Sequence, residues 1–119
     1  LDDVLISHLD APVALLTCTS PSHGHFVAIR LRATTTARDA IGTQLTLRVG
    51  GRRLYRQQTA GDGFMASNQR QVIFGTGSST TVGPLEVRWP SGRVDTFKQV
   101  PVDGELLLVE GRQPIPVPR

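Results

Sequence analysis

The sequence predicts an all-β fold, either a small β-sandwich or a partly open β-barrel of about seven to eight short antiparallel strands. Apolar and polar residues alternate over several short segments, which is the pattern of a strand with one buried face. Turns rich in Gly and Pro separate these segments, and no long segment repeats apolar residues at the helical period. A chain of 119 residues has room for one domain with a real core.

The strands of the main body are predicted in chain order from this alternation. Val27, Ile29 and Leu31 would share the inward face of the first strand, and Gly50-Gly51 would connect the second and third strands as a hairpin. The stretch 34–41 reads as a loop with room for one helical turn. We expect strands over residues 26–32, 43–49, 52–59, 71–74, 85–89, 94–97 and 105–110.

The chain divides into three parts. Residues 1–22 contain two short apolar runs that predict a hairpin, which is marginal alone and must join the body's sheet or belong to a neighbour. Residues 23–111 form the β body. Residues 112–119 carry Pro at every second position, which predicts an extended terminal tail or linker that cannot lie inside a sheet. Because Leu1 is not a start methionine, we expect the chain to be part of a longer protein.

Composition excludes several classes of protein. The formal net charge of +3 is weak for a nucleic-acid-binding domain of this length. Cys18 is the single cysteine, so the chain can form neither an internal disulfide nor a cysteine-based zinc site. No apolar run approaches the roughly 18 residues that a membrane-spanning helix needs.

Two loops carry candidate binding residues. Asp39 is either a ligand group or a carboxylate that shapes its turn while pairing with Arg38. Asp62 lies between Gly61 and Gly63, whose freedom of φ predicts a turn. Phe64, directly after this turn, is either an exposed recognition aromatic or a core residue.

Trp89 and the turn after it are predicted to be structural. In phase with Leu85 and Val87, Trp89 should lie in the core with its indole N–H on a carbonyl, and could stack on a sugar only if it faced outward. Pro90 and Gly92 fit the corners of a tight turn. Gly42 and Gly75 are assigned structural roles at the end of a loop and of a strand.

The sequence predicts no catalytic residue, no metal and no cofactor. His23 and His25 could both ligate a metal, but Asp10 is the only available guess for a third ligand. Cys18 lacks a paired His, and the sequence contains no nucleophile-elbow or phosphate-loop motif. A glycosidase-like pair of Asp39 and Asp62 is retained only as a minor alternative.

Four motifs occur in the order of a known family. They are Ala-Arg-Asp-Ala-Ile-Gly-Thr at 37–43, Ala-Gly-Asp-Gly-Phe-Met at 60–65, Phe-Gly-Thr-Gly at 74–77 and Leu-Glu-Val-Arg-Trp-Pro-Ser-Gly-Arg at 85–93. Together they strongly resemble the ASPIC/UnbV domain. The resemblance implies a C-terminal module of secreted proteins built on FG-GAP/VCBS β-propeller repeats, such as the cartilage acidic protein family. Residues 1–18 resemble the end of the last propeller repeat, although Thr17-Cys18-Thr19 stands where relatives often carry Asn.

The expected function is therefore a non-catalytic accessory module in a secreted, periplasmic or cell-surface protein. Its expected partners are an upstream propeller of the same protein and an extracellular protein or glycan, with nucleic acid and a membrane span not expected. The alternative is a carbohydrate- or polyanion-binding module, which would use arginines expected to face outward: Arg30, Arg32, Arg48, Arg56 and Arg88.

Overall fold

The structure, a computed structural model, describes residues 3–21 and 23–118. These residues form ten strands in three sheets and contain no helix, which confirms the all-β prediction. The strands are β1 (Val4–Ile6), β2 (Ala14–Leu16), β3 (His25–Arg32), β4 (Gln44–Val49), β5 (Arg52–Gln57), β6 (Val72–Gly77), β7 (Leu85–Arg88), β8 (Val94–Phe97), β9 (Gly104–Val109) and β10 (Ile115–Val117).

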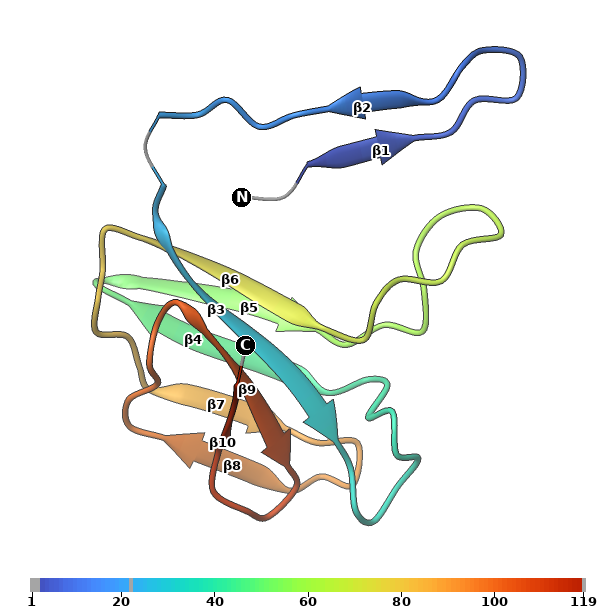
Figure 1. Cartoon of the computed structure of the whole chain (residues 1–119). Helices are drawn as coiled ribbons and strands as arrows, with labels where there is room; N and C mark the ends of the chain where they lie inside the picture. The colour runs from blue at the N-terminus through green and yellow to red at the C-terminus, as the bar shows by residue number, and fades with distance from the viewer. Residues whose placement is uncertain (1–2, 22, 119) are drawn as a thin grey trace.

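The body is a sandwich of two four-stranded sheets (Figure 1). The first sheet has the strand order β10-β9-β3-β6 and the second β5-β4-β7-β8, and they do not close into a barrel. One neighbouring pair departs from the antiparallel prediction, because β3 and β9 run parallel. The chain builds the whole second sheet between these two strands, and such a long crossover is what a parallel pair requires.

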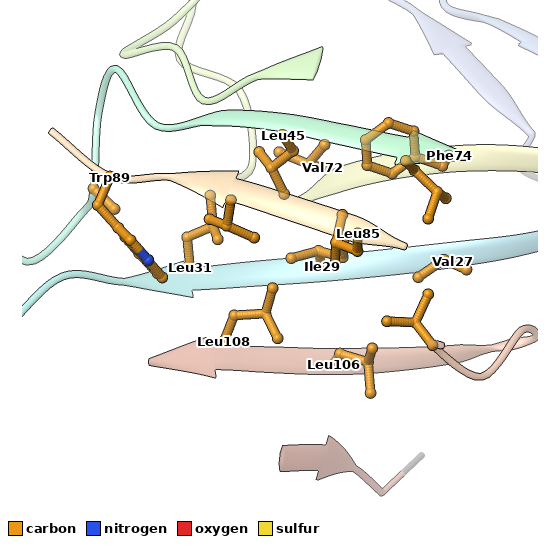
Figure 2. Packing of buried hydrophobic residues seen from close by; sticks show 14 of the residues in the cluster. Val27, Ile29, Leu31, Leu45, Val72, Phe74, Leu85, Trp89, Leu106 and Leu108 are labelled. Carbon is orange, nitrogen blue, oxygen red and sulfur yellow. The ribbon is translucent and has the colours of Figure 1, made fainter. Parts of the chain in front are cut away.

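The core lies between the two sheets, where the predicted inward faces meet (Figure 2). Buried residues alternate with more exposed ones along β4, β7 and β9, as the sequence predicts, while in β3 Ala28 is buried in addition to the inward Val27, Ile29 and Leu31. Phe74 and Trp89 are the bulkiest buried side chains. Burying one large apolar side chain contributes about 1.5–3 kcal/mol, so this cluster supplies the main stabilisation of the body. Its largest fully buried members are Trp89, Phe74, Ile29, Leu45, Leu47, Leu85, Leu106, Leu108, Val27 and Val87.

The largest differences from the sequence prediction within the body are at β6 and in the loop 34–41. β6 continues through Gly75 to Gly77 instead of ending at Phe74, because these glycines still pair with Phe26 and His25 of β3. The loop 34–41 contains bends and turns but no helical turn. Both differences lie where tertiary pairing, rather than local sequence preference, decides the conformation.

The proline-rich tail contributes a strand. β10 pairs antiparallel with β9, at the outer edge of the first sheet. Pro116 lies in the middle of this strand and has no backbone N–H to donate, which an edge strand tolerates and a central strand does not. The expectation of a tail or linker outside a β body that ends at residue 111 is therefore wrong for residues 115–117. Their position at the edge agrees with the expectation that this segment cannot lie inside a sheet.

The N-terminal hairpin of β1 and β2 forms a two-stranded sheet of its own and joins neither sheet of the body (Figure 1). Its base is closed by the backbone N–H of Cys18, which donates to Asp3 Oδ1 at 2.9 Å. His8 Nδ1 lies 2.9 Å from the carbonyl oxygen of Pro12 at its turn. Most of its large apolar side chains are exposed: Val4, Leu5, Ile6, Leu9, Val13, Leu15 and Leu16.

Candidate functional site

The turn after Trp89 has the predicted conformation. Gly92 has a φ of +89°, and its N–H donates to the carbonyl of Trp89 at 2.9 Å. The N–H of Trp89 in turn donates to the carbonyl of Arg93 at 2.9 Å. Pro90 and Gly92 therefore serve the structural roles that the sequence suggested for them.

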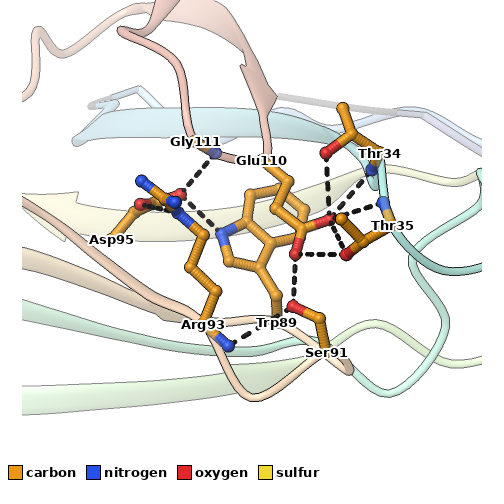
Figure 3. A network of polar contacts seen from close by, with 8 residues as sticks. All are labelled: Thr34, Thr35, Trp89, Ser91, Arg93, Asp95, Glu110 and Gly111. Carbon is orange, nitrogen blue, oxygen red and sulfur yellow. Dashed lines mark hydrogen bonds and ion pairs between the residues drawn. The ribbon is translucent and has the colours of Figure 1, made fainter.

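Glu110 is buried, and its carboxylate faces Ser91 of this turn (Figure 3). Ser91 Oγ donates to its Oε1, and the backbone N–H groups of Thr34 and Thr35 donate to its Oε2 at 2.9 and 3.2 Å. The Ser91 bond is the strongest influence and the threonine bonds act in the same direction. Although burial opposes them, these donors hold the pKa of Glu110 at about 2, below its ordinary value of 4.5.

Asp95 is the second carboxylate of this network. It accepts hydrogen bonds from the indole Nε1–H of Trp89 at 2.8 Å, from the N–H of Gly111 at 2.9 Å and from Arg93 Nε at 2.8 Å. Burial alone would raise the pKa of Asp95, but the donors from Gly111, Arg93 and Trp89 outweigh burial and lower it. The core position predicted for Trp89 is confirmed, while its indole partner is a carboxylate rather than a carbonyl.

The carboxylates of Glu110 and Asp95 connect separate segments of the fold. They join the turn after β7 to the loop after β3 and to the end of β9, three segments far apart in the sequence (Figure 3). Because Trp89 is only 2% exposed, it offers no platform on which a sugar could stack. The motif at residues 85–93 therefore has a structural role in the fold. Sequence reasoning missed Glu110 and Asp95, because neither stands in a recognisable local pattern.

A loop cluster formed by residues 37–42 and 59–70 contains the predicted binding residues Asp39 and Asp62. Arg70, which sequence reasoning missed, connects its two segments. Arg70 Nε lies 3.9 Å from Asp39 Oδ2, and Arg70 Nη1 donates to the carbonyls of Thr59 at 3.4 Å and of Ala60. Asp39 thus pairs with Arg70 rather than with its neighbour Arg38, whose carbonyl accepts from the N–H of Ala33.

Asp62 shapes the second segment of the loop cluster. Its Oδ2 accepts from Thr59 Oγ1 and from Asn68 Nδ2, each at 3.2 Å. Gly63 has a φ of +91°, whereas Gly61 is required for close approach, since a Cβ there would lie 2.9 Å from the carbonyl oxygen of Ala66. Asp39 and Asp62 therefore each have their own polar partners within the loop cluster. Asp62 lines a hollow of about 240 Å³, and Asp39 is not among the residues that line it.

Phe64 and Met65 form the exposed tip of the loop cluster, which we call the Phe-Met tip. Their side chains are 92% and 91% exposed. The core alternative for Phe64 is therefore wrong, because the loop between β5 and β6 extends away from the sandwich (Figure 1). A fully exposed aromatic beside a methionine, on a loop braced at its base, is the kind of anchor that protein interfaces use.

The predicted arginines do not form one surface. Arg30 and Arg32 lie on the outer face of the first sheet, where Arg30 pairs with Glu105, and Arg88 lies on the outer face of the second. Arg56 does not face outward: it is paired with the buried Leu45, and its guanidinium carbon lies 5.8 Å from the centre of the Phe74 ring. Alternation along single strands could not tell which sheet each strand would join.

Arg48 shares the outer face of the second sheet with Arg88, and there it lies directly opposite Arg53 on β5. Tyr55, the next outward residue of β5, is about half exposed. Sequence reasoning missed Arg53, because its face depends on the register of the hairpin after Gly50. We call these three arginines the Arg48–Arg53–Arg88 patch: Arg48 and Arg53 are direct neighbours, and Arg88 lies opposite Gln44, further along β4.

The predicted metal-site residues do not converge. Among residues 3–21 and 23–118, no group of three His, Cys, Asp or Glu side chains could hold a metal ion. Asp10, the suggested third ligand, lies between β1 and β2 in the separate hairpin, whereas His25 lies in β3 of the body. His25 instead pairs with Asp103, its Nδ1 lying 2.5 Å from Asp103 Oδ2.

A family model described as "ASPIC and UnbV" matches residues 33–115, more than half of the chain. Comparisons with curated proteins and with solved structures gave no match. Within the described residues there is no helix of the length and apolarity needed to cross a membrane.

Proposed function

Because the chain belongs to the ASPIC and UnbV family, we propose that it is a non-catalytic accessory β module at the C-terminal end of a secreted propeller protein. It would dock on the last propeller repeat of the same protein and bind a partner in the extracellular matrix or at a cell surface. The proposed location is secreted, periplasmic or cell-surface. Support comes from family membership and from two exposed apolar features, the hairpin and the Phe-Met tip.

The hairpin of β1 and β2 is the observation that carries this proposal. Val4 pairs with Leu16 and Leu5 with Leu15, so apolar side chains lie on both faces of the hairpin. In this two-stranded sheet, the outer edges of β1 and β2 pair with no further strand of the described chain. A two-stranded sheet of this kind is marginal in water and its open edges invite further strands. A propeller blade would supply both the missing strands and the apolar cover.

The Phe-Met tip supports a contact with a second partner. Arg70 and Asp62 hold the base of the loop through hydrogen bonds and the ion pair to Asp39, so the loop presents its tip from a defined base. A rigid support lowers the entropy that binding would otherwise cost. The chemistry of the tip fits an apolar pocket on a protein, since an aromatic ring and a thioether pack well there.

Hydrogen exchange tests the docking of the hairpin. The backbone amides of β1 and β2 should exchange rapidly in residues 1–119 alone, and at least about a hundredfold more slowly in the full-length gene product, where a blade covers them. The amides of β3 serve as the control, because their exchange should be the same in both proteins. Equal, rapid exchange of β1 and β2 in the full-length product would overturn the docking.

The absence of catalysis is tested separately. We expect no turnover of polysaccharides, esters or phosphate esters, because the carboxylates of the loop cluster and of the Trp89 turn are engaged in structural contacts. A robust turnover number that is lost on substituting a residue of the chain would contradict a purely binding role.

The Arg48–Arg53–Arg88 patch favours a second candidate function, the binding of a polyanion such as an acidic glycan. Like charges directly opposite each other on a sheet destabilise it, and Arg48 faces Arg53 in this way. An anionic ligand would relieve that repulsion. Glu86, 3.9 Å from Arg88, offsets part of the charge, which is why this function stands second.

Titration with heparin tests this candidate. Binding should weaken linearly in the logarithm of salt concentration, and Arg53→Gln should lower both the affinity and the salt slope, the latter by about one. Arg32→Gln on the other sheet is the matched control and should change neither quantity. No saturable binding at low salt would remove this candidate.

A further inference from the structure

A hollow of about 920 Å³ lies over the outer face of the first sheet. Its floor is apolar, formed by Phe26 and Ala28 of β3 and by Ile73 of β6. Above Gly75 the space is empty, because a Cβ placed there would meet no atom within 4 Å. A flat ligand could therefore lie directly against the backbone of β6 at this point.

The rim of the hollow is polar and one part of it is firmly held. Asp103 accepts from His25 through Oδ2 and from the N–H of Phe26 through Oδ1 at 3.4 Å, while its own N–H donates to the carbonyl of Phe26 at 2.7 Å. A carboxylate only accepts, so the hydrogen of a neutral His25 ring lies on Nδ1. The other ring nitrogen, Nε2, is then an acceptor available to a ligand.

The rim is rich in hydrogen-bond acceptors. Besides His25 Nε2 it contains the carboxylates of Asp103 and Glu105 and the side-chain amide of Gln71. Glu105 is already paired with Arg30. The matching ligand brings several hydroxyl donors around the edge of a ring and an apolar C–H face for the floor, and two carboxylates disfavour an anion.

We propose that this hollow binds a neutral pyranose sugar, with the ring lying over Gly75 between Ile73 and Phe26 and its hydroxyls donating to Asp103 and His25. This site is separate from the hairpin, from the Phe-Met tip and from the Arg48–Arg53–Arg88 patch. It depends on none of the proposed functions, and it takes a neutral ligand where that patch would take an anion.

The experiment is a titration of the full chain with neutral methyl pyranosides, followed by amide chemical shifts. A single pyranose should bind weakly, with a Kd on the order of 1 mM, and should move the amides of Ile73, Gly75 and Gly77 in a saturable way. The absence of saturable shifts with every pyranoside tested would overturn the proposal, as would tighter binding of a uronic acid at these amides.

Two variants locate the site. Gly75→Leu fills the empty space without a backbone clash and should weaken binding at least about tenfold. Asp103→Asn replaces an acceptor by an amide and should also weaken binding about tenfold, which keeps the test decisive if Gly75→Leu fails to fold. Glu86→Gln on the opposite sheet is the control and should bind normally. Unchanged affinity in a folded variant at either site would contradict the assignment.

Discussion

The body and the N-terminal hairpin differ in how far their apolar residues are buried. Both are built of short strands rich in apolar residues, but the body buries its apolar faces between two sheets while the hairpin leaves both of its faces in water. Phe74 is fully buried, whereas Leu5 is 71% exposed on a strand of comparable composition. The body thus covers its own apolar residues, whereas the exposed apolar residues of the hairpin are what its proposed docking on a neighbour would cover.

The largest expected effect comes from the core of the body. Phe74→Ala should lower the free energy of unfolding by about 3–5 kcal/mol, because the cavity left between the sheets cannot collapse fully. Urea unfolding at neutral pH measures this loss. Leu5→Ala in the hairpin is the matched control and should change it by less than about 0.5 kcal/mol. Similar losses in the two variants would erase the distinction between the two regions.

The hydrogen bonds to Glu110 should contribute less to the free energy of unfolding than Phe74 does. Glu110→Gln removes the charge that Ser91, Thr34 and Thr35 stabilise, so we expect a loss of about 1–3 kcal/mol at neutral pH. Thermal or urea unfolding checks this value. An unchanged free energy of unfolding would show that these hydrogen bonds do not hold the three segments together.

Acid titration examines the same hydrogen bonds independently. The pKa of Glu110 is lowered from 4.5 to about 2, so its stabilisation is fully present above about pH 4.5 and is lost as the pH falls towards 2. Asp95, whose pKa is also lowered, acts in the same direction. The Glu110→Gln variant should therefore lose less stability than the wild type between pH 4.5 and 2.5, while Glu86→Gln should follow the wild type. Parallel pH profiles of wild type and Glu110→Gln would contradict this account.

Removing Arg70, which connects the two segments of the loop cluster, should have a local effect. Arg70→Ala deletes the donor to the Ala60 and Thr59 carbonyls and the partner of Asp39, at a cost of about 1 kcal/mol. Amide exchange over residues 59–69 should accelerate, while β3 and β9 exchange as before. Arg38→Ala is the control. Uniform acceleration over the whole body would indicate that Arg70 supports the core rather than the loop cluster.

The Phe-Met tip should contribute almost nothing to stability. Phe64→Ser should change the unfolding free energy by less than about 0.5 kcal/mol, because the ring is exposed. A thermal melt beside wild type measures this. A loss of several kcal/mol would mean that Phe64 packs against the body, and the tip would lose its proposed role in binding.

Local pattern predicted most of the strands, because alternation such as that of Val27, Ile29 and Leu31 reports directly on a buried face. It also placed Trp89 in the core and Gly92 in its turn. It could not predict the parallel neighbour of β3, since that choice depends on where the chain returns after the second sheet.

The candidate sites were harder to predict than the strands. Arg70, Asp103 and Glu110 act through partners far away in the sequence, and no local spacing announces such contacts. Phe64 remained ambiguous, because the direction of a loop side chain depends on tertiary packing. The proposed binding arginines divided between two sheets for the same reason, since alternation gives the face of a strand but not the sheet that the strand joins.

Deleting the hairpin tests most directly the claim that the body folds without it. If the body is complete in itself, a chain of residues 21–119 should unfold with the same free energy as residues 1–119, within about 0.5 kcal/mol, and with nearly the same dependence on urea concentration. A loss of more than about 2 kcal/mol, or a non-cooperative transition, would contradict it, because the hairpin would then be part of the body's own fold.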